Sequence, residues 1–462
     1  MAERNSTIRA AALLLGPFAA LAAGWLAMLE GLSFEAAVTL GVTVLCVVWW
    51  VFEPIPIPAT SLLPFAILPL AGVLSPVQAS AAYGNQVVLL LLGGFILSTS
   101  LERSGAHRRI AIGMVRLFGG GSSRRLVFGF MTAAVGLSMW ISNTATTLML
   151  LPVAMAVLER SRDPQLAVPL LIGIAYAASL GGIGTPIGTP PNVIFMGIYE
   201  SATGESVSFL RWMTWGVPVV LVFLPLMALW LTRHVHHRGD IELPEVGAWR
   251  PEEWRTLAVF AATTFLWITR EVPFGGWHAL FHLPYSNDAI VAFAAVIAMF
   301  IVPNGHGSRL LDWPTAEKIP WGVLILFGGG IAIADAFVAS GLSQVIGATL
   351  SGLASWQPYF IMLMVCLVVT LMTEATSNTA TTSLLMPVLA AAAIGAAIDP
   401  RLMMVPAAMS ASCAFMLPVA TAPNVIMFST GRITVERMIR EGFALNLIGA
   451  IVISALCYLL IR

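Results

Sequence analysis

Two identical polar motifs interrupt this otherwise apolar sequence. The run S-N-T-A-T-T occupies residues 142–147 and recurs at 377–382, and a proline follows each run at the same distance, Pro152 and Pro387. Hydroxyl and carboxamide groups can donate hydrogen bonds to an anion or offer oxygen atoms to a hard cation. A single motif of this kind would more often cap a helix or bond to a neighbouring helix. Its repetition favours a ligand site.

A second pair of motifs lies downstream of the first. The run T-P-P-N-V-I at 189–194 matches T-A-P-N-V-I at 421–426, which is 232 positions later. Proline lacks an N–H and clashes with the preceding helical turn, so the adjacent prolines predict a break in a helix. The unwound residues would expose backbone carbonyls, such as those of Gly188 and Ala420, as further oxygen ligands.

The four motifs contain no basic side chain. Neither the two polar runs nor the segments Gly181–Pro191 and Pro418–Pro423 include Arg, Lys or His. A bound dianion would therefore face a desolvation cost that no side-chain charge offsets. Two monovalent cations bound beside the dianion would neutralise it, which would couple their binding to that of the anion. This reasoning predicts cation coupling and leaves the identity of the cation open.

The composition requires that most of the protein surface faces lipid. Of 462 residues, 58% are hydrophobic and only 10% are charged, whereas about a quarter of the residues in a soluble domain are charged. The net charge is zero, and no basic stripe indicates nucleic-acid binding. The four cysteines lie alone in apolar runs, so we expect buried, inert thiols. The stretch Ala10–Leu29 is longer than a cleavable signal segment and predicts a first spanning helix that is retained.

The apolar segments predict an all-α membrane protein with about eleven transmembrane helices and two re-entrant hairpins. A transmembrane helix needs roughly 20 apolar residues. The stretches Leu126–Leu158 and Tyr359–Ile398 are each too long for one helix and carry a polar run in the middle, which favours hairpins. The eleven predicted spans are Ala10–Leu29, Ala36–Phe52, Ala59–Val73, Asn85–Leu101, Leu166–Gly182, Met213–Leu231, Leu257–Ile268, Ala289–Val302, Trp321–Ala339, Leu402–Leu417 and Phe443–Ile461.

Arginine is distributed unequally between the predicted loops. With the N-terminus inside, the cytoplasmic segments include the basic run from Arg103 to Arg125 and the arginines of residues 232–256. The outer segments keep few basic residues. This positive-inside bias predicts a multi-pass protein of the cell (inner) membrane with a cytoplasmic N-terminus and an outer C-terminus. Charge does not separate hairpins from paired full spans, because both give the same orientation beyond them.

The chain is predicted to be an inverted duplication. Besides the two pairs of motifs, Gly93 and Gly94 correspond to Gly329 and Gly330, at nearly the same offset. The first unit begins with a helix that runs inward and the second with a helix that runs outward, an arrangement found in many secondary transporters. The predicted parts are an N-terminal helix (residues 1–35), a first repeat (36–231), a cytoplasmic linker (232–256) and a second repeat (257–462).

A structural role is favoured for the remaining titratable groups. Glu374 stands three residues before the second polar run, where the first repeat has Met139. We expect it to be a hydrogen-bonded structural carboxylate, and a proton-titrating group is the alternative. Glu53, Glu271 and Asp335 lie near the ends of spans and are expected to be interfacial or paired. A solvated loop rather than a metal site is expected at His234, His236 and His237, and the glycine run 119–121 lacks the lysine of a phosphate loop.

These motifs resemble those of the divalent anion:sodium symporter (DASS) family, which includes sodium-coupled di- and tricarboxylate transporters. The paired S-N-T motifs with downstream proline breaks carry the resemblance, together with W-x-x-x-E-P-I-P from Trp49 and I-L-F-G-G-G-I from Ile325 to Ile331. The match covers nearly the whole chain. It implies a homodimer in which each protomer has a scaffold and a transport domain that moves like an elevator. One departure is Ala422, where the family commonly has a second proline.

The resemblance also implies one substrate site between two sodium sites. Internal symmetry supports the two sets of sodium ligands, because Thr373 follows Ser138 by 235 positions and Ala420 follows Gly188 by 232. The implied substrate contacts are Asn143, Thr144, Thr189, Ser377, Asn378, Thr379 and Thr421. The implied sodium ligands are Ser138, Ser142, Asn143 and Gly188 in the first site, and Thr373, Thr376, Asn378 and Ala420 in the second.

The leading hypothesis is a secondary active transporter that imports C4-dicarboxylates such as succinate, malate or fumarate together with sodium ions. No organic cofactor and no nucleic-acid partner are expected. The alternatives are a dicarboxylate exchanger, a proton-coupled carrier, or a citrate or sulfate carrier of the same fold. An ion channel is the alternative from another class. An intramembrane enzyme is disfavoured, because the sequence has none of the motifs H-E-x-x-H, G-x-G-D or G-x-S-x-G.

Overall fold

The computed structural model describes residues 2–118, 122–161, 163, 165–235, 247–349, 352 and 356–461. The glycine run 119–121 and the histidines at 236 and 237 lie outside these ranges. The described residues form helices joined by short connections, with one isolated β-bridge between Pro303 and Arg309.

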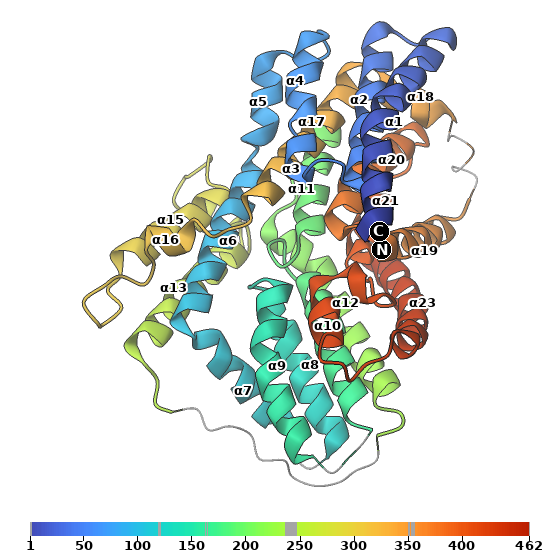
Figure 1. The fold of residues 1–462 in the computed structure, drawn as a ribbon. Coiled ribbons are helices and arrows are strands. Elements are labelled where there is room, and N and C mark those ends of the chain that lie inside the picture. The colour runs from blue at the N-terminus through green and yellow to red at the C-terminus, as the bar shows by residue number, and fades with distance from the viewer. Residues whose placement is uncertain are drawn as a thin grey trace.

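The helices follow one another along the chain without a sheet among the described residues (Figure 1). Their bounds are α1 Ala2–Leu29, α2 Phe34–Phe52, α3 Ile57–Thr60, α4 Leu63–Leu70, α5 Pro76–Tyr83, α6 Gln86–Ser104, α7 Ala106–Phe118, α8 Ser123–Ser138, α9 Asn143–Arg160, α10 Ala167–Gly182, α11 Pro190–Thr203, α12 Phe209–Leu231, α13 Pro251–Thr269, α14 Gly276–Leu280, α15 Asp288–Ile301, α16 Trp313–Ala316, α17 Trp321–Ala339, α18 Leu342–Thr349, α19 Pro358–Ala375, α20 Asn378–Gly395, α21 Arg401–Ala411, η2 Pro418–Ala420, α22 Ala422–Phe428 and α23 Val435–Ile461.

The protein is a multi-pass membrane protein. Within the described residues, eight helical segments are long and apolar enough to cross a membrane, and three shorter apolar helical segments accompany them. Large apolar side chains cover the outer surfaces of the long helices; Leu21 of α1 and Leu229 of α12, for example, are 72% and 68% exposed. So many exposed large apolar side chains are unusual for a soluble monomer and suit contact with lipid.

Both polar runs lie at helix junctions, as the sequence predicts. α8 ends at Ser138 and α9 begins at Asn143, while α19 ends at Ala375 and α20 begins at Asn378. At the first junction the hydroxyl of Ser142 accepts a hydrogen bond from the backbone N–H of residue 145, a serine N-cap. The two halves of each predicted hairpin are therefore separate helices that meet at the Ser-Asn-Thr residues.

Both proline motifs also lie where a helix is interrupted. α10 ends at Gly182 and α11 begins at Pro190, where a missing N–H costs nothing because the first N–H groups of a helix have no intrahelical acceptor. In the second repeat the predicted span Leu402–Leu417 is too long, since α21 ends at Ala411. The residues that follow are unwound, and three of their N–H groups donate hydrogen bonds to the carboxylate of Glu374. The spans predicted from the sequence do not include α11 or α22, the helices that begin after the two breaks.

The helices beside the two proline breaks pack against each other's surroundings. The four helices that flank the proline breaks pack across the repeats: α11 lies against α20 and α21, and α22 lies against α9 and α10. In Figure 1 the pair α8 and α9 extends toward the lower end of the view, whereas α1, α2, α4 and α5 occupy the upper end. These helix contacts bring the two polar runs and the two breaks to the same region of the molecule.

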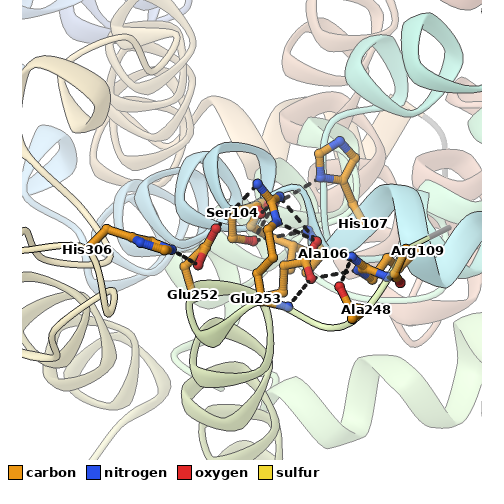
Figure 2. A network of polar contacts seen from close by, with 11 residues as sticks. Ser104, Ala106, His107, Arg109, Ala248, Glu252, Glu253 and His306 are labelled. Atoms are coloured by element: carbon orange, nitrogen blue, oxygen red, sulfur yellow. Dashed lines mark hydrogen bonds and ion pairs between the residues drawn. The ribbon is translucent and has the colours of Figure 1, made fainter.

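A network of charged residues ties α7 to the start of α13. Arg109 of α7 donates from Nε to Oε2 of Glu253 at 2.6 Å, and the backbone N–H of Arg250 donates to the same oxygen at 2.7 Å. Glu252, one residue earlier, lies 3.1 Å from Nε2 of His306 (Figure 2). Burial raises the pKa of Glu253, but the hydrogen bonds from Arg250 and Arg109 outweigh it and hold the pKa below its usual value.

Replacing Arg109 by alanine should lower the melting temperature of the detergent-solubilised protein by about 3 °C or more. The change leaves part of a buried carboxylate without its donor, which costs about 2 kcal/mol. Because the pKa of Glu253 is depressed, this contribution is present at neutral pH and is lost as the pH falls through that pKa, so the difference from wild type should shrink in acid. The exposed Arg432→Ala is the matched control. Equal melting temperatures for R109A and wild type at neutral pH would contradict the assignment.

Candidate functional site

One cavity of about 960 Å³ collects the residues of all four motifs. Gly94, Phe95 and Ser98 of α6 form part of its wall. Of the residues expected to bind substrate or sodium, those that line the cavity are Ser142, Asn143, Thr144, Gly188, Thr189, Thr376, Ser377, Asn378, Thr379, Ala420 and Thr421. Segments that are more than 230 positions apart in the sequence thus present hydroxyl, carboxamide and carbonyl groups to one space.

The remaining two predicted sodium ligands lie directly behind the cavity wall. Ser138 and Thr373 are fully buried, and each donates its hydroxyl hydrogen to the carboxamide oxygen of the asparagine five residues later. The distances are 2.5 Å to Oδ1 of Asn143 and 2.7 Å to Oδ1 of Asn378. The two repeats therefore build the same pair of adjacent oxygen atoms.

The hydroxyl of Thr373 has a second acceptor within reach. Its Oγ1 lies 2.9 Å from the carbonyl oxygen of Ala411 as well as 2.7 Å from Oδ1 of Asn378. A hydroxyl has one hydrogen and two lone pairs. When its hydrogen turns toward Ala411, the carboxamide oxygen of Asn378 no longer accepts from Thr373.

Glu374 holds the unwound residues of the second break. Its carboxylate accepts hydrogen bonds from the backbone N–H groups of Phe415, Met416 and Leu417, at 2.7, 2.8 and 3.0 Å. The amide of Asn446 on α23 donates to it at 2.7 Å. Four donors to one buried carboxylate match the structural role that the sequence favours for this residue.

The first break is held without a charge. At the position equivalent to Glu374 stands Met139, and its backbone carbonyl accepts a hydrogen bond from the hydroxyl of Thr185. Thr185 occupies the position equivalent to Leu417, 232 residues earlier. The two breaks are thus fixed by different chemistry: a neutral hydroxyl holds the first, and a carboxylate holds the second.

Arg9 and Glu53 line the cavity, which the sequence analysis did not predict, although Glu53 is paired as expected. Both line the cavity, where Nη2 of Arg9 lies 3.7 Å from Oε2 of Glu53, and both side chains are about half exposed. Arg9 is the one basic residue among the described residues that line the cavity. It belongs to α1, outside the four motifs, and no spacing in the sequence relates it to residue 53. Its pairing and exposure place it at the cavity margin.

The other predicted groups lie outside the cavity. Asp335 accepts a hydrogen bond from Ser201, and Glu271 pairs with Arg270 at 2.6 Å. His234 does not line the cavity. All four cysteines are buried and unpaired thiols, as expected. Within the part of the chain that the structure describes, no group of three or more His, Cys, Asp or Glu side chains could hold a metal ion.

The fold and the site together define a helical membrane protein with a cavity that joins two matched helix interruptions. A model of the citrate transporter family (CitMHS) matches residues 47–404. The sodium-dependent dicarboxylate transporter SdcS of Staphylococcus saprophyticus is 38% identical over 475 aligned positions, covering 97% of this chain and 91% of that protein. SdcS of Staphylococcus aureus strain MRSA252 is 38% identical over 479 positions, with 98% and 91% coverage.

The fold also resembles a solved transporter structure. The crystal structure of the YdaH transporter of Alcanivorax borkumensis aligns with 85% of this chain and 88% of its own, with a TM-score of 0.58 and 15% sequence identity. This likeness concerns the fold alone. On the family match and the SdcS identities, the chain belongs to the citrate transporter family, and the predicted relation to the sodium-coupled di- and tricarboxylate transporters of the DASS type is confirmed. It is a transporter and not an enzyme.

Proposed function

We propose that this transporter imports C4-dicarboxylates such as succinate, malate or fumarate together with sodium ions. Relatives that are 38% identical over nearly the whole chain are sodium-dependent dicarboxylate transporters. The observation that carries the proposal is the pair of matched oxygen clusters around Asn143 and Asn378 in one cavity. The motifs that form them contain no basic residue, and Arg9 at the cavity is paired with Glu53, so we expect bound cations to offset the charge of a dianion.

Each predicted residue receives a role in this proposal. The carboxamide and hydroxyl groups at the helix junctions donate to the substrate carboxylates, and the backbone carbonyls at the breaks complete the shells of the cations. Substrate would contact Asn143, Thr144, Thr189, Ser377, Asn378, Thr379 and Thr421. Sodium would bind Ser138, Ser142, Asn143 and Gly188 in the first site and Thr373, Thr376, Asn378 and Ala420 in the second.

The proposed architecture is that of two inverted repeats with about eleven spans and two re-entrant hairpins. The N-terminal helix (residues 1–35) precedes the first repeat (36–231), and a cytoplasmic linker (232–256) joins it to the second (257–462). The N-terminus would lie in the cytoplasm and the C-terminus outside the cell (inner) membrane. Each protomer of a homodimer would move its transport domain like an elevator against a scaffold. The packing of each break against helices of the other repeat supports a transport domain that moves as one body.

Uptake into proteoliposomes tests the function directly. Labelled succinate should accumulate when an inward sodium gradient is imposed and should not accumulate when potassium or choline replaces sodium. Transport of succinate that proceeds equally well without sodium would overturn the coupling. Competition by unlabelled citrate, 2-oxoglutarate and sulfate in the same assay defines the range of anions. Citrate is included among the competitors because the matching family is named for citrate transport.

The same vesicles separate import from exchange. If the protein is an exchanger, uptake requires dicarboxylate inside the vesicle and persists without a cation gradient. A proton-coupled carrier would instead respond to an inward pH gradient in the absence of sodium. Under the proposed function, empty vesicles with an inward sodium gradient suffice for uptake.

A further inference from the structure

The asparagine of each proline break makes the same two hydrogen bonds. Asn192 donates from Nδ2 to the carbonyl oxygens of Gly182 at 2.8 Å and Thr185 at 2.7 Å. Asn424 donates from Nδ2 to the carbonyl oxygens of Ala414 at 2.9 Å and Leu417 at 3.0 Å. In both repeats the acceptors stand ten and seven residues before the asparagine. The arrangement is therefore a shared feature of the two breaks.

These bonds connect the helix after each break to the residues before and within the break. The last carbonyls of a helix have no partner within the helix, and in the first repeat the carbonyl of Gly182 at the end of α10 is one of them. A carboxamide supplies two N–H donors. One side chain near the start of α11 thus ties that helix to the end of α10 and to the loop residue Thr185. The loop that carries Gly188 is held at both ends.

In the first repeat this closure shapes the predicted cation site. A methyl group built on Gly182 would lie 3.1 Å from the carbonyl oxygen of Gly188 and 3.2 Å from Oδ1 of Asn143. The two predicted ligand oxygens therefore border the same point beside Gly182. A methyl group on Gly188 would in turn lie 2.6 Å from the carbonyl oxygen of Gly182. Because Asn192 binds that carbonyl, it fixes the backbone against which Gly188 rests.

Each asparagine is fully buried and uses its Nδ2 group in both of these bonds. The side chains of Asn192 and Asn424 are 0% exposed, and within the described residues neither Oδ1 has a hydrogen-bond partner. A buried acceptor without a partner is destabilising. An asparagine at this place is therefore useful for its two N–H donors, at both breaks.

We propose that Asn192 and Asn424 are positioning residues for cation coupling. Without touching an ion, they hold the carbonyls of Gly188 and Ala420 toward the first and the second sodium site. This inference rests on the proposed function. It adds two residues that are absent from the sets of ligands expected from the sequence.

Isosteric replacement tests the proposal. Aspartate keeps the shape of asparagine but has no N–H donor. In proteoliposomes, Asn192→Asp and Asn424→Asp should each raise the sodium concentration for half-maximal succinate uptake at least tenfold. The KM for succinate at saturating sodium should change less than threefold. Asn304→Asp is the matched control, because Oδ1 of Asn304 only accepts, from the backbone N–H groups of His306 and Ser308, and it should behave like wild type.

The outcomes separate this inference from the function on which it rests. A wild-type protein without sodium-dependent uptake overturns the proposed function, and the inference with it. A different result overturns the inference alone. In that case the wild type is sodium-dependent, and the aspartate variants have a lower maximal rate but an unchanged sodium concentration for half-maximal uptake, as expected for a purely structural role. Where the aspartate variants do not fold, Asn192→Ala removes both N–H donors without adding charge. Its melting temperature should then rise less with added sodium than that of wild type, and an equal rise contradicts the proposal.

Discussion

Asn378→Ala is expected to lower kcat/KM for sodium-driven succinate uptake at least about a hundredfold. Its side chain faces the cavity, and its Oδ1 lies 2.7 Å from the hydroxyl of Thr373. In the proposed site, alanine therefore removes a cation ligand and a donor to the substrate at once. Hydrogen bonds to charged groups contribute about 1.5–3 kcal/mol each, and two of them correspond to a factor of more than 100. The twin substitution Asn143→Ala should have the same effect.

A neighbouring residue on the same helix provides the control. Ser383 of α20 is 1% exposed and does not line the cavity, and within the described residues its hydroxyl has no hydrogen-bond partner. Ser383→Ala should therefore transport within about twofold of wild type. Both variants are compared by initial rates and by gel filtration, which shows whether the protein is folded and of native size. Asn378→Ala protein that transports within threefold of wild type would remove Asn378 from the site.

The helix interruptions were predictable because their causes are local. Proline removes an N–H and obstructs the preceding turn, so the run at 189–194 breaks a helix whatever surrounds it. A serine followed by asparagine and threonine favours a helix start, and Ser142 indeed caps α9. Since both signals recur at a constant offset, the sequence also predicts which residues correspond in the two repeats. The cavity that unites the four motifs follows from that correspondence.

The rest of the site depends on contacts between distant segments. Glu374 and Asn446 are 72 positions apart, and Arg9 meets Glu53 only because α1 packs against α2. No periodicity or motif relates such residues, so sequence patterns alone do not pair them. The early end of α21 has the same origin, because the free N–H groups that follow it bond to Glu374. Asn192 is an intermediate case, since its motif is visible in the sequence while its two acceptors are not.

The two polar runs are matched in the oxygen atoms that we propose as sodium ligands, and they differ in the groups that support them. Ser138 with Asn143 and Thr373 with Asn378 have nearly the same geometry. Behind them, a neutral hydroxyl of Thr185 stabilises one break and the carboxylate of Glu374 stabilises the other. A fixed negative charge favours a nearby cation. We therefore expect the second sodium site to bind more tightly than the first.

Glu374→Gln is expected to reduce sodium-driven uptake at least about a hundredfold. Three backbone N–H groups and the amide of Asn446 converge on the carboxylate. A glutamine offers one acceptor oxygen, and its NH₂ group faces N–H groups that it cannot satisfy. Buried donors without an acceptor cost about 1–3 kcal/mol each, so the unwound segment should lose its conformation. The nearby charge that favours the second sodium ion is lost as well.

The same variant decides between a structural carboxylate and a proton carrier. A carboxylate that only carries a proton is needed for gradient-driven uptake but not for exchange, so Glu374→Gln would then keep counterflow of labelled against unlabelled succinate. A carboxylate that holds the break is needed for both, and both should fail. Glu271→Gln, which changes a carboxylate that is 48% exposed, is the control for loss of charge.

In the double variant Glu374→Met, Leu417→Thr the side chains of the first break replace those of the second. Partial recovery relative to Glu374→Met alone is expected, because a hydroxyl could then bond to the carbonyl of residue 374 as Thr185 bonds to Met139. Preserved counterflow in the glutamine variant would instead favour the proton-coupled alternative.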